Sequence, residues 1–103
     1  MMKVNDILKC RWGYSMIIVD FYKVVKATAA TVWLQPLESE VVKSYGAGAS
    51  MGECVAGAPK EGAQIIRRKI CKSCIDGEEW VKISPDEFAR KWEGKPVHFD
   101  YND

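Results

Sequence analysis

The chain has 103 residues, 48% of them hydrophobic and 28% charged, so a single domain spanning residues 1–103 is expected. A net charge of +1 excludes a general polyelectrolyte attraction to nucleic acid, although it leaves room for a local basic patch. The N-terminal residues lack an apolar signal-peptide core, and the longest apolar run, 16–19, is too short to cross a bilayer. A soluble cytoplasmic protein that does not associate with membranes is therefore predicted.

The first half of the chain predicts β-strands joined by short turns. Residues 5–12 form the first expected strand, which the turn signal at 13–15 ends. Residues 17–26 form a longer second strand. Its apolar residues occupy both alternating sets of positions, so this strand should be buried on both faces or bent by a bulge.

A third strand is expected after the small residues 27–30, which suit a hairpin connection. It covers residues 31–35 and should end at Pro36, because proline cannot donate to a strand ladder, with 37–42 as an extension after a kink.

The region 45–62 differs in character, since glycine, alanine and proline accumulate there and predict a long surface loop. Strand character resumes at 64–71. Asp76-Gly77 is a strong hairpin-turn dipeptide, across which residues 80–83 should pair back.

One helix is predicted, over about residues 85–93. Ser84, Pro85 and Glu87 match an N-cap, a first helical position and the third position of a capping box. Phe88 and Trp92 follow at helical spacing, and Gly94 stands at a typical stop position.

These elements indicate a mainly β fold, namely a small antiparallel barrel of about five strands with one short C-terminal helix. SH3-like and OB-like barrels both fit this pattern. The SH3-like barrel is favoured because the strands are few and the helix comes late in the chain.

Two motifs, Trp-Gly-Tyr at 12–14 and Val-Asp-Phe-Tyr-x-Val-Val at 19–25, lie in segments that match a known family, namely 12–16, 19–26, 31–34, 67–69, 80–84 and 89–97. Through these segments the chain resembles a family of small proteins carried by bacteriophages and other mobile elements of Gram-positive and gut bacteria. Family members often carry polar residues where this chain has 16–18, so a ligand at that segment would differ here. The resemblance implies a phage-type protein in the cytoplasm of a bacterial host, and it brings no assigned activity.

Aromatic residues near the first turn are the first candidate binding site. Trp12, Tyr14, Tyr22 and Trp33 are expected to converge at one end of the barrel, where exposed rings bind peptides or stack on bases. Tyr22 and Trp33 equally suit the core, because large aromatic side chains fill small cores. Asp20 lies in the most apolar strand, so it either is buried with a partner and a shifted pKa, or it simply faces solvent or caps the barrel rim.

A second candidate site is the basic cluster of Arg67, Arg68 and Lys69, with Lys72 close by in the sequence. On a strand, residues 67 and 69 point to one side and residue 68 points to the other. Such a cluster binds phosphates or an acidic protein, or it simply keeps the strand solvated.

The cysteines form the only formal motif, Cys71-Lys72-Ser73-Cys74. The pair could supply half of a zinc site, but Cys10, Cys54 and His98 offer no second close pair. The cysteines also lie outside the family pattern, and a redox role lacks the usual helix N-terminus. We therefore expect ordinary thiols and no cofactor.

No catalytic triad or carboxylate pair can be identified, so an enzyme is not expected. The sequence favours a non-enzymatic phage or mobile-element protein that binds a host macromolecule, either protein or nucleic acid. An anti-defence role, for example as an anti-CRISPR inhibitor, extends this hypothesis. The alternatives are a protein that sequesters a nucleotide immune signal, which a homo-oligomer would favour because such sites often form between subunits, and a zinc-stapled adaptor.

Overall fold

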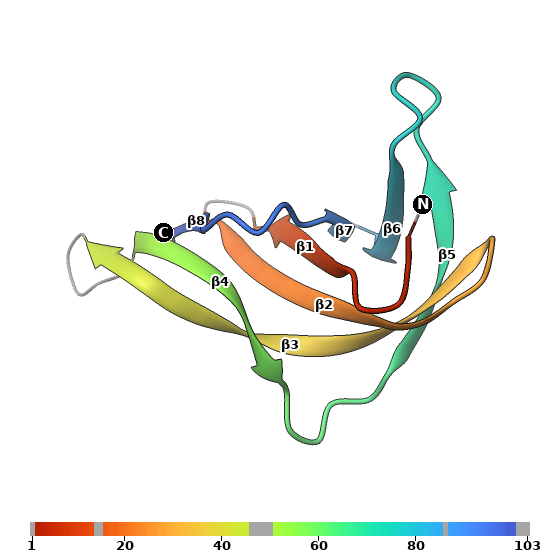
Figure 1. Cartoon of the computed structure of the whole chain (residues 1–103). Coiled ribbons are helices and arrows are strands. Elements are labelled where there is room, and N and C mark those ends of the chain that lie inside the picture. Colours follow the sequence, from red (N-terminus) through yellow and green to blue (C-terminus); the bar gives the residue numbers. More distant parts are fainter. Residues whose placement is uncertain (1, 14–15, 46–50, 86, 101–103) are drawn as a thin grey trace.

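Segments rich in β-branched and aromatic residues become antiparallel strands in the computed structural model, which describes residues 2–13, 16–45, 51–85 and 87–100 (Figure 1). No helix occurs among these described residues. The strands are β1 (Ile7–Trp12), β2 (Ile18–Ala27), β3 (Thr31–Tyr45), β4 (Met51–Pro59), β5 (Ile66–Lys72), β6 (Glu79–Ser84), β7 (Glu87–Lys91) and β8 (Val97–Asp100).

Six of the strands pair into a closed ring. The ladder runs β2–β1–β7–β6–β5–β3, and β3 pairs again with β2. We call this unit the six-stranded ring. Closure removes the unpaired edges that an open sheet of these strands would expose.

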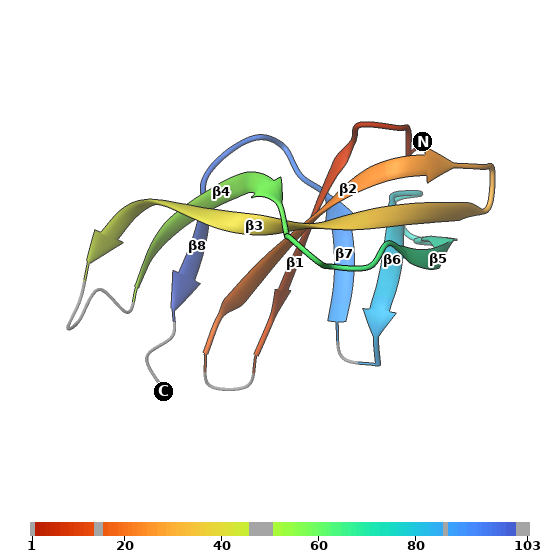
Figure 2. The same ribbon diagram turned by 90° about the horizontal axis from the view of Figure 1, so that it is seen from below.

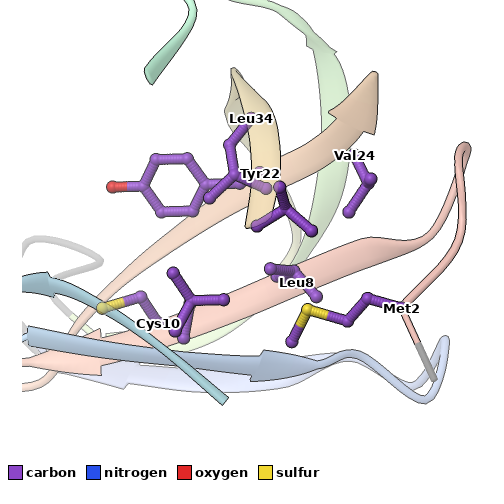
Figure 3. Close-up of a cluster of buried hydrophobic side chains, with 9 residues drawn as sticks. Met2, Leu8, Cys10, Tyr22, Val24 and Leu34 are labelled. Carbon is purple, nitrogen blue, oxygen red and sulfur yellow. The ribbon is translucent and has the colours of Figure 1, made fainter. Parts of the chain in front are cut away.

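The inside of the ring is the first hydrophobic core, and every strand of the ring contributes to it. Leu8, Tyr22 and Leu34 are among its buried residues (Figure 3). The others are Met2, Cys10, Val24, Val32, Val81 and Ala89, with Ala27, Ile66, Ile70 and Ile83 packed against them. At about 25 cal/mol per Å² of apolar area removed from water, this core is a main source of stability.

β3 runs through both halves of the molecule (Figures 1 and 2). Its first residues pair with β5 on one side and with β2 on the other. From Leu37 to Tyr45, β4 takes the place of β5 as the partner of β3, and β8 pairs with the far side of β4. A bridge between Ile17 and Asp100 then joins β8 to the residue that precedes β2. We call β4, β8 and the second half of β3 the arm.

The second hydrophobic core lies between the ring and the arm. Phe21 and Leu37 face it from β2 and β3, and Trp92 packs its ring edge-on against Phe21 at 5.2 Å between centroids. The other buried members are Val19, Cys54, Val97 and Phe99. β2 is therefore buried on both faces, and its ladder with β3 shifts register between Val24 and Lys26. Both structural expectations for this strand are confirmed.

The predicted helix over residues 85–93 is wrong, because β7 occupies Glu87–Lys91. The Ser84 hydroxyl does donate to the Glu87 carboxylate at 2.6 Å, as in a capping box, but these two residues are cross-strand partners in the β6–β7 hairpin. A proline after serine suits a turn as well as a helix start. The hairpin form allows Ala89 to fill the ring core.

The predicted loop over residues 45–62 is also wrong in its second part, since β4 occupies Met51–Pro59 and 46–50 lie outside the described residues. Small residues serve close packing here. A Cβ on Gly52 would collide with the carbonyl oxygen of Lys43 and lie 3.0 Å from the Phe99 ring. Glycine is therefore required by the approach of β3 and β8, where a surface loop would place no such demand.

Pro36 does not end the third strand. It stands where β3 changes partners, because pairing with β5 stops at Leu34 and pairing with β4 starts at Leu37. Neither β5 nor β4 has a ladder residue opposite Pro36, so the N–H that proline lacks is not missed on that side of β3. The mainly β, antiparallel class is confirmed, whereas a five-stranded SH3-like barrel with a helix is not found.

Candidate functional site

The outer surface of the six-stranded ring is basic. Directly opposed residues of antiparallel strands share a face, so the register separates residues that point into the ring from those that point out. Val19, Phe21, Ile7 and Leu37 point out but are covered by the arm and Trp92. The remaining outward residues, which we call the basic outer face, are Lys9, Arg11, Lys23, Lys26, Thr31, Trp33, Gln35, Arg67, Lys69, Cys71, Trp80, Lys82, Phe88 and Arg90. No carboxylate belongs to this set, as far as the described residues extend.

Trp33 is the centre of one row across this face. It lies opposite Lys26 on β2 and opposite Arg67 on β5. The Lys26 ammonium lies 4.6 Å from the centroid of the indole ring, and the Arg67 guanidinium carbon lies 5.6 Å from it. Cation–π attraction to the Trp33 ring keeps the two positively charged groups close together, although they would otherwise repel each other.

Arg68 occupies the other side of β5 and is half-buried. Its Nε and one terminal nitrogen donate to the carbonyl oxygen of Ile83 at 3.3 and 3.2 Å, and its other terminal nitrogen donates to the carbonyl oxygen of Arg67 at 2.9 Å. The expected alternation along the strand is thus confirmed. Arg68 is a fixed cation whose hydrogen-bond partners are neutral carbonyls.

A shallow hollow of about 340 Å³ lies next to these cations. It is lined by Ala30, Thr31, Arg67, Arg68 and Lys69. Thr31 and Lys69 are cross-strand partners, and the N–H of Ile70 donates to the carbonyl oxygen of Ala30 at 2.8 Å. The β2–β3 turn therefore borders a concentrated group of positive charges.

A second aromatic group lies on β6 and β7. Trp80 and Phe88 pack edge to face, with ring centroids 5.4 Å apart, and the Phe88 side chain is 45% exposed. Lys82 is the cross-strand partner of Phe88. Arg90 makes the one described ion pair of this face, to Glu78 at 3.2 Å, but both of its members are largely exposed, so it is weak.

The described carboxylates lie outside this face, on the arm, in turns, at strand ends and, for Asp20, at the rim of the ring. Glu38, Glu40 and Glu61 line a hollow of about 400 Å³ beside β4. Positive and negative side chains are therefore concentrated on different parts of the surface, although the net charge is only +1. A local field from the basic outer face can attract anions that the net charge alone would not.

At one rim of the ring, the Trp12 indole donates to the Asp20 carboxylate at 2.6 Å. The Lys60 ammonium lies 4.0 Å from the second oxygen of the same carboxylate. Asp20 therefore lies at the rim of the ring, where its carboxylate contacts Trp12 and Lys60, and it is not a carboxylate buried in the core. Trp12 remains 37% exposed and lines a small hollow with Arg11 and Gly13.

Tyr22 and Cys10 lie inside the ring beneath this rim, and in Figure 3 the Tyr22 hydroxyl points away from Val24 and Met2. Burial, with added repulsion from nearby carboxylates, raises the pKa of the Cys10 thiol to about 12 and raises that of the Tyr22 hydroxyl well above its usual range. The Tyr22 ring is therefore not available for stacking at the surface. Tyr14 lies outside the described residues.

The two cysteines of the Cys-x-x-Cys motif separate in burial. Cys71 is half-buried on β5, and Cys74 is exposed in the β5–β6 connection. Cys54 is buried in the second core, and burial raises the pKa of its thiol. Within the described ranges, no group of three or more His, Cys, Asp or Glu side chains is placed to hold a metal ion.

The basic outer face combines predicted and unpredicted residues. Arg67 and Lys69 belong to the expected cluster, whose third residue, Arg68, points to the other side of β5. Trp33 was a candidate for the rim or the core, and Lys26 and Lys82 were not singled out. A usable signal was present in 80–82, where Val81 separates Trp80 from Lys82, so that a strand places the tryptophan and the lysine on the same face.

Comparison with family models, curated proteins and solved structures finds no match to this chain. In the part of the chain that the structure describes, no helix is long and apolar enough to span a membrane.

Proposed function

We propose that this chain is a non-enzymatic phage or mobile-element protein that binds a host macromolecule, and that the macromolecule is single-stranded nucleic acid. The observation that carries the proposal is the basic outer face, where cations lie beside Trp33, Trp80 and Phe88, and where the one described carboxylate that pairs with a cation of the face is the exposed Glu78. Cations neutralise backbone phosphates, and aromatic rings stack on unpaired bases without regard to sequence.

The shape of the face favours a single strand over a duplex. The cations lie around the outside of a ring, so the surface is convex. Duplex DNA is stiff over about 150 base pairs and would meet a convex surface with few phosphates. A flexible single strand can follow the curvature and bring successive phosphates to cations on neighbouring strands, which lie about 4.8 Å apart.

The biological setting rests on the resemblance to phage and mobile-element proteins. Nucleases and regulators of host defence act on nucleic acid, so a phage protein that covers single strands would withhold their substrate or guide. An anti-defence role is therefore part of the proposal.

The direct test is fluorescence anisotropy with a labelled single strand and a duplex of equal length, each about 20 nucleotides long. We expect tighter binding of the single strand and a steep salt dependence. If five cations are engaged, the logarithm of affinity falls by about 3.5 per logarithm of salt, or roughly 100-fold between 50 and 200 mM. Unchanged anisotropy, or binding that does not depend on salt, would contradict the proposal.

A further inference from the structure

We infer that the hollow between the β2–β3 turn and β5 binds a terminal phosphomonoester, so that the protein recognises the phosphorylated end of a strand. This inference rests on the proposed function and adds a specific subsite to it. The hollow is lined by Ala30, Thr31, Arg67, Arg68 and Lys69, and it lies at the end of the ring where β2 turns into β3.

The charge of the lining fits a monoester better than a diester. Two cationic side chains, those of Arg67 and Lys69, lie on the same side of β5 as Thr31, and the lining of the hollow includes no carboxylate among the described residues. A terminal phosphate carries about −1.5 to −2 charges at neutral pH and three strong acceptor oxygens. A phosphodiester within the strand carries only one charge, so it would satisfy fewer of these donors.

Arg67 is held in place before any ligand arrives. Its guanidinium carbon lies 5.6 Å from the centroid of the Trp33 ring. A guanidinium group has five N–H donors. Arg67 can therefore donate to a phosphate, and little side-chain entropy is lost when it binds. The guanidinium of Arg68 is instead hydrogen-bonded to Ile83 on the other side of β5.

The position of the hollow suits the end of a strand. Lys69 and Thr31 belong to the basic outer face, while Ala30 belongs to the turn where this face stops. A strand that follows the face across β6 and β5 can place its terminal phosphate in the hollow while its inner phosphates contact Lys82 and Arg90. The geometry does not favour one chemical end, so the test includes both.

The experiment compares internally labelled single strands of one sequence that carry a 5′-phosphate, a 3′-phosphate or hydroxyl groups at both ends. We expect one of the two phosphorylated strands to bind at least about tenfold tighter than the hydroxyl strand, as expected for added charge-assisted hydrogen bonds. Equal affinity for all three strands would overturn the inference and leave the proposed function intact. Absence of binding to all three would instead contradict the proposed function.

Two variants locate the effect. Lys69→Gln and, separately, Thr31→Val should reduce the preference for the phosphorylated strand, whereas the control Lys82→Gln should weaken all strands by the same factor. A preference that persists in both hollow variants would place the end-binding site elsewhere and overturn the inference. If a nucleoside monophosphate competed as strongly as the phosphorylated strand, the hollow would be a site for a free nucleotide, and the inference of strand-end recognition would also be overturned.

Discussion

Replacement of Arg67 and Lys69 by glutamate is expected to weaken single-strand binding by at least about 50-fold near 0.1 M salt. Each lost phosphate contact removes roughly 0.7 to 0.9 counterions from the binding equilibrium, and the new carboxylates add repulsion. Both side chains are exposed on β5. Arg67 lies in the same row as Trp33 and Lys26, and Lys69 lies in the neighbouring row, opposite Thr31. The measurement is anisotropy with the unphosphorylated strand.

The matched control is the double variant Lys3→Glu and Lys95→Glu. It changes the net charge by the same amount, and both lysines are exposed outside the basic outer face. We expect this variant to lose much less affinity than the Arg67 and Lys69 variant. Equal losses in the two double variants would show that net charge alone governs binding, contrary to a localised interface.

The second large effect concerns the core between the ring and the arm. Phe21 is completely buried on the outer side of β2 and packs against Trp92 and the arm. Phe21→Ala should lower the free energy of unfolding by about 3 to 5 kcal/mol, because the phenyl group is lost and a cavity remains. Thermal unfolding should then occur more than about 10 °C lower.

Phe88→Ala is the control for this prediction. Phe88 is the same residue type on the outer side of β7, but it is 45% exposed and packs mainly on Trp80. Its loss should cost about 1 kcal/mol or less, with a correspondingly small change in melting temperature. If the two alanine variants had similar melting temperatures, the second core would not contribute as described.

Much of the strand structure could be predicted from local patterns. The apolar residues on both faces of β2 indicated either burial on both sides or a bulge, and the strand has both features, which are encoded within ten consecutive residues. The hairpin at Asp76-Gly77 was predicted on similar grounds, and β5 and β6 pair across it.

The incorrect predictions share a cause, which is that pairing with distant strands overrode a local preference. The segment from Ser84 to Glu87 has the residues of a capping box, and a helix was the better local choice. The neighbouring strands β6 and β1 offer Ala89 a buried place in the ring, which a helix could not fill. Similarly, the glycines near β4 have no local strand preference, and β3 and β8 impose the extended form.

The sequence predicted only those features of the candidate site that lie within a single strand. The alternation of Arg67, Arg68 and Lys69 follows from strand geometry and is confirmed. Trp33 lies opposite Arg67 through pairing of β3 with β5, two strands that are distant in sequence, and no local pattern specifies that register. The absence of described carboxylates from the basic outer face likewise became visible only once the ring placed its strands side by side.

The most direct test of the central claim is a nuclear magnetic resonance titration of isotope-labelled protein with an unphosphorylated single strand. The account predicts shifts in the indole N–H signals of Trp33 and Trp80 and in the amide signals of Arg67 and Lys82. The Trp92 indole, which donates to the carbonyl oxygen of Lys95 at 2.7 Å beside the second core, should remain unchanged. Shifts confined to Trp92 and the strands of the arm, or no shifts at all, would contradict the claim that the basic outer face binds nucleic acid.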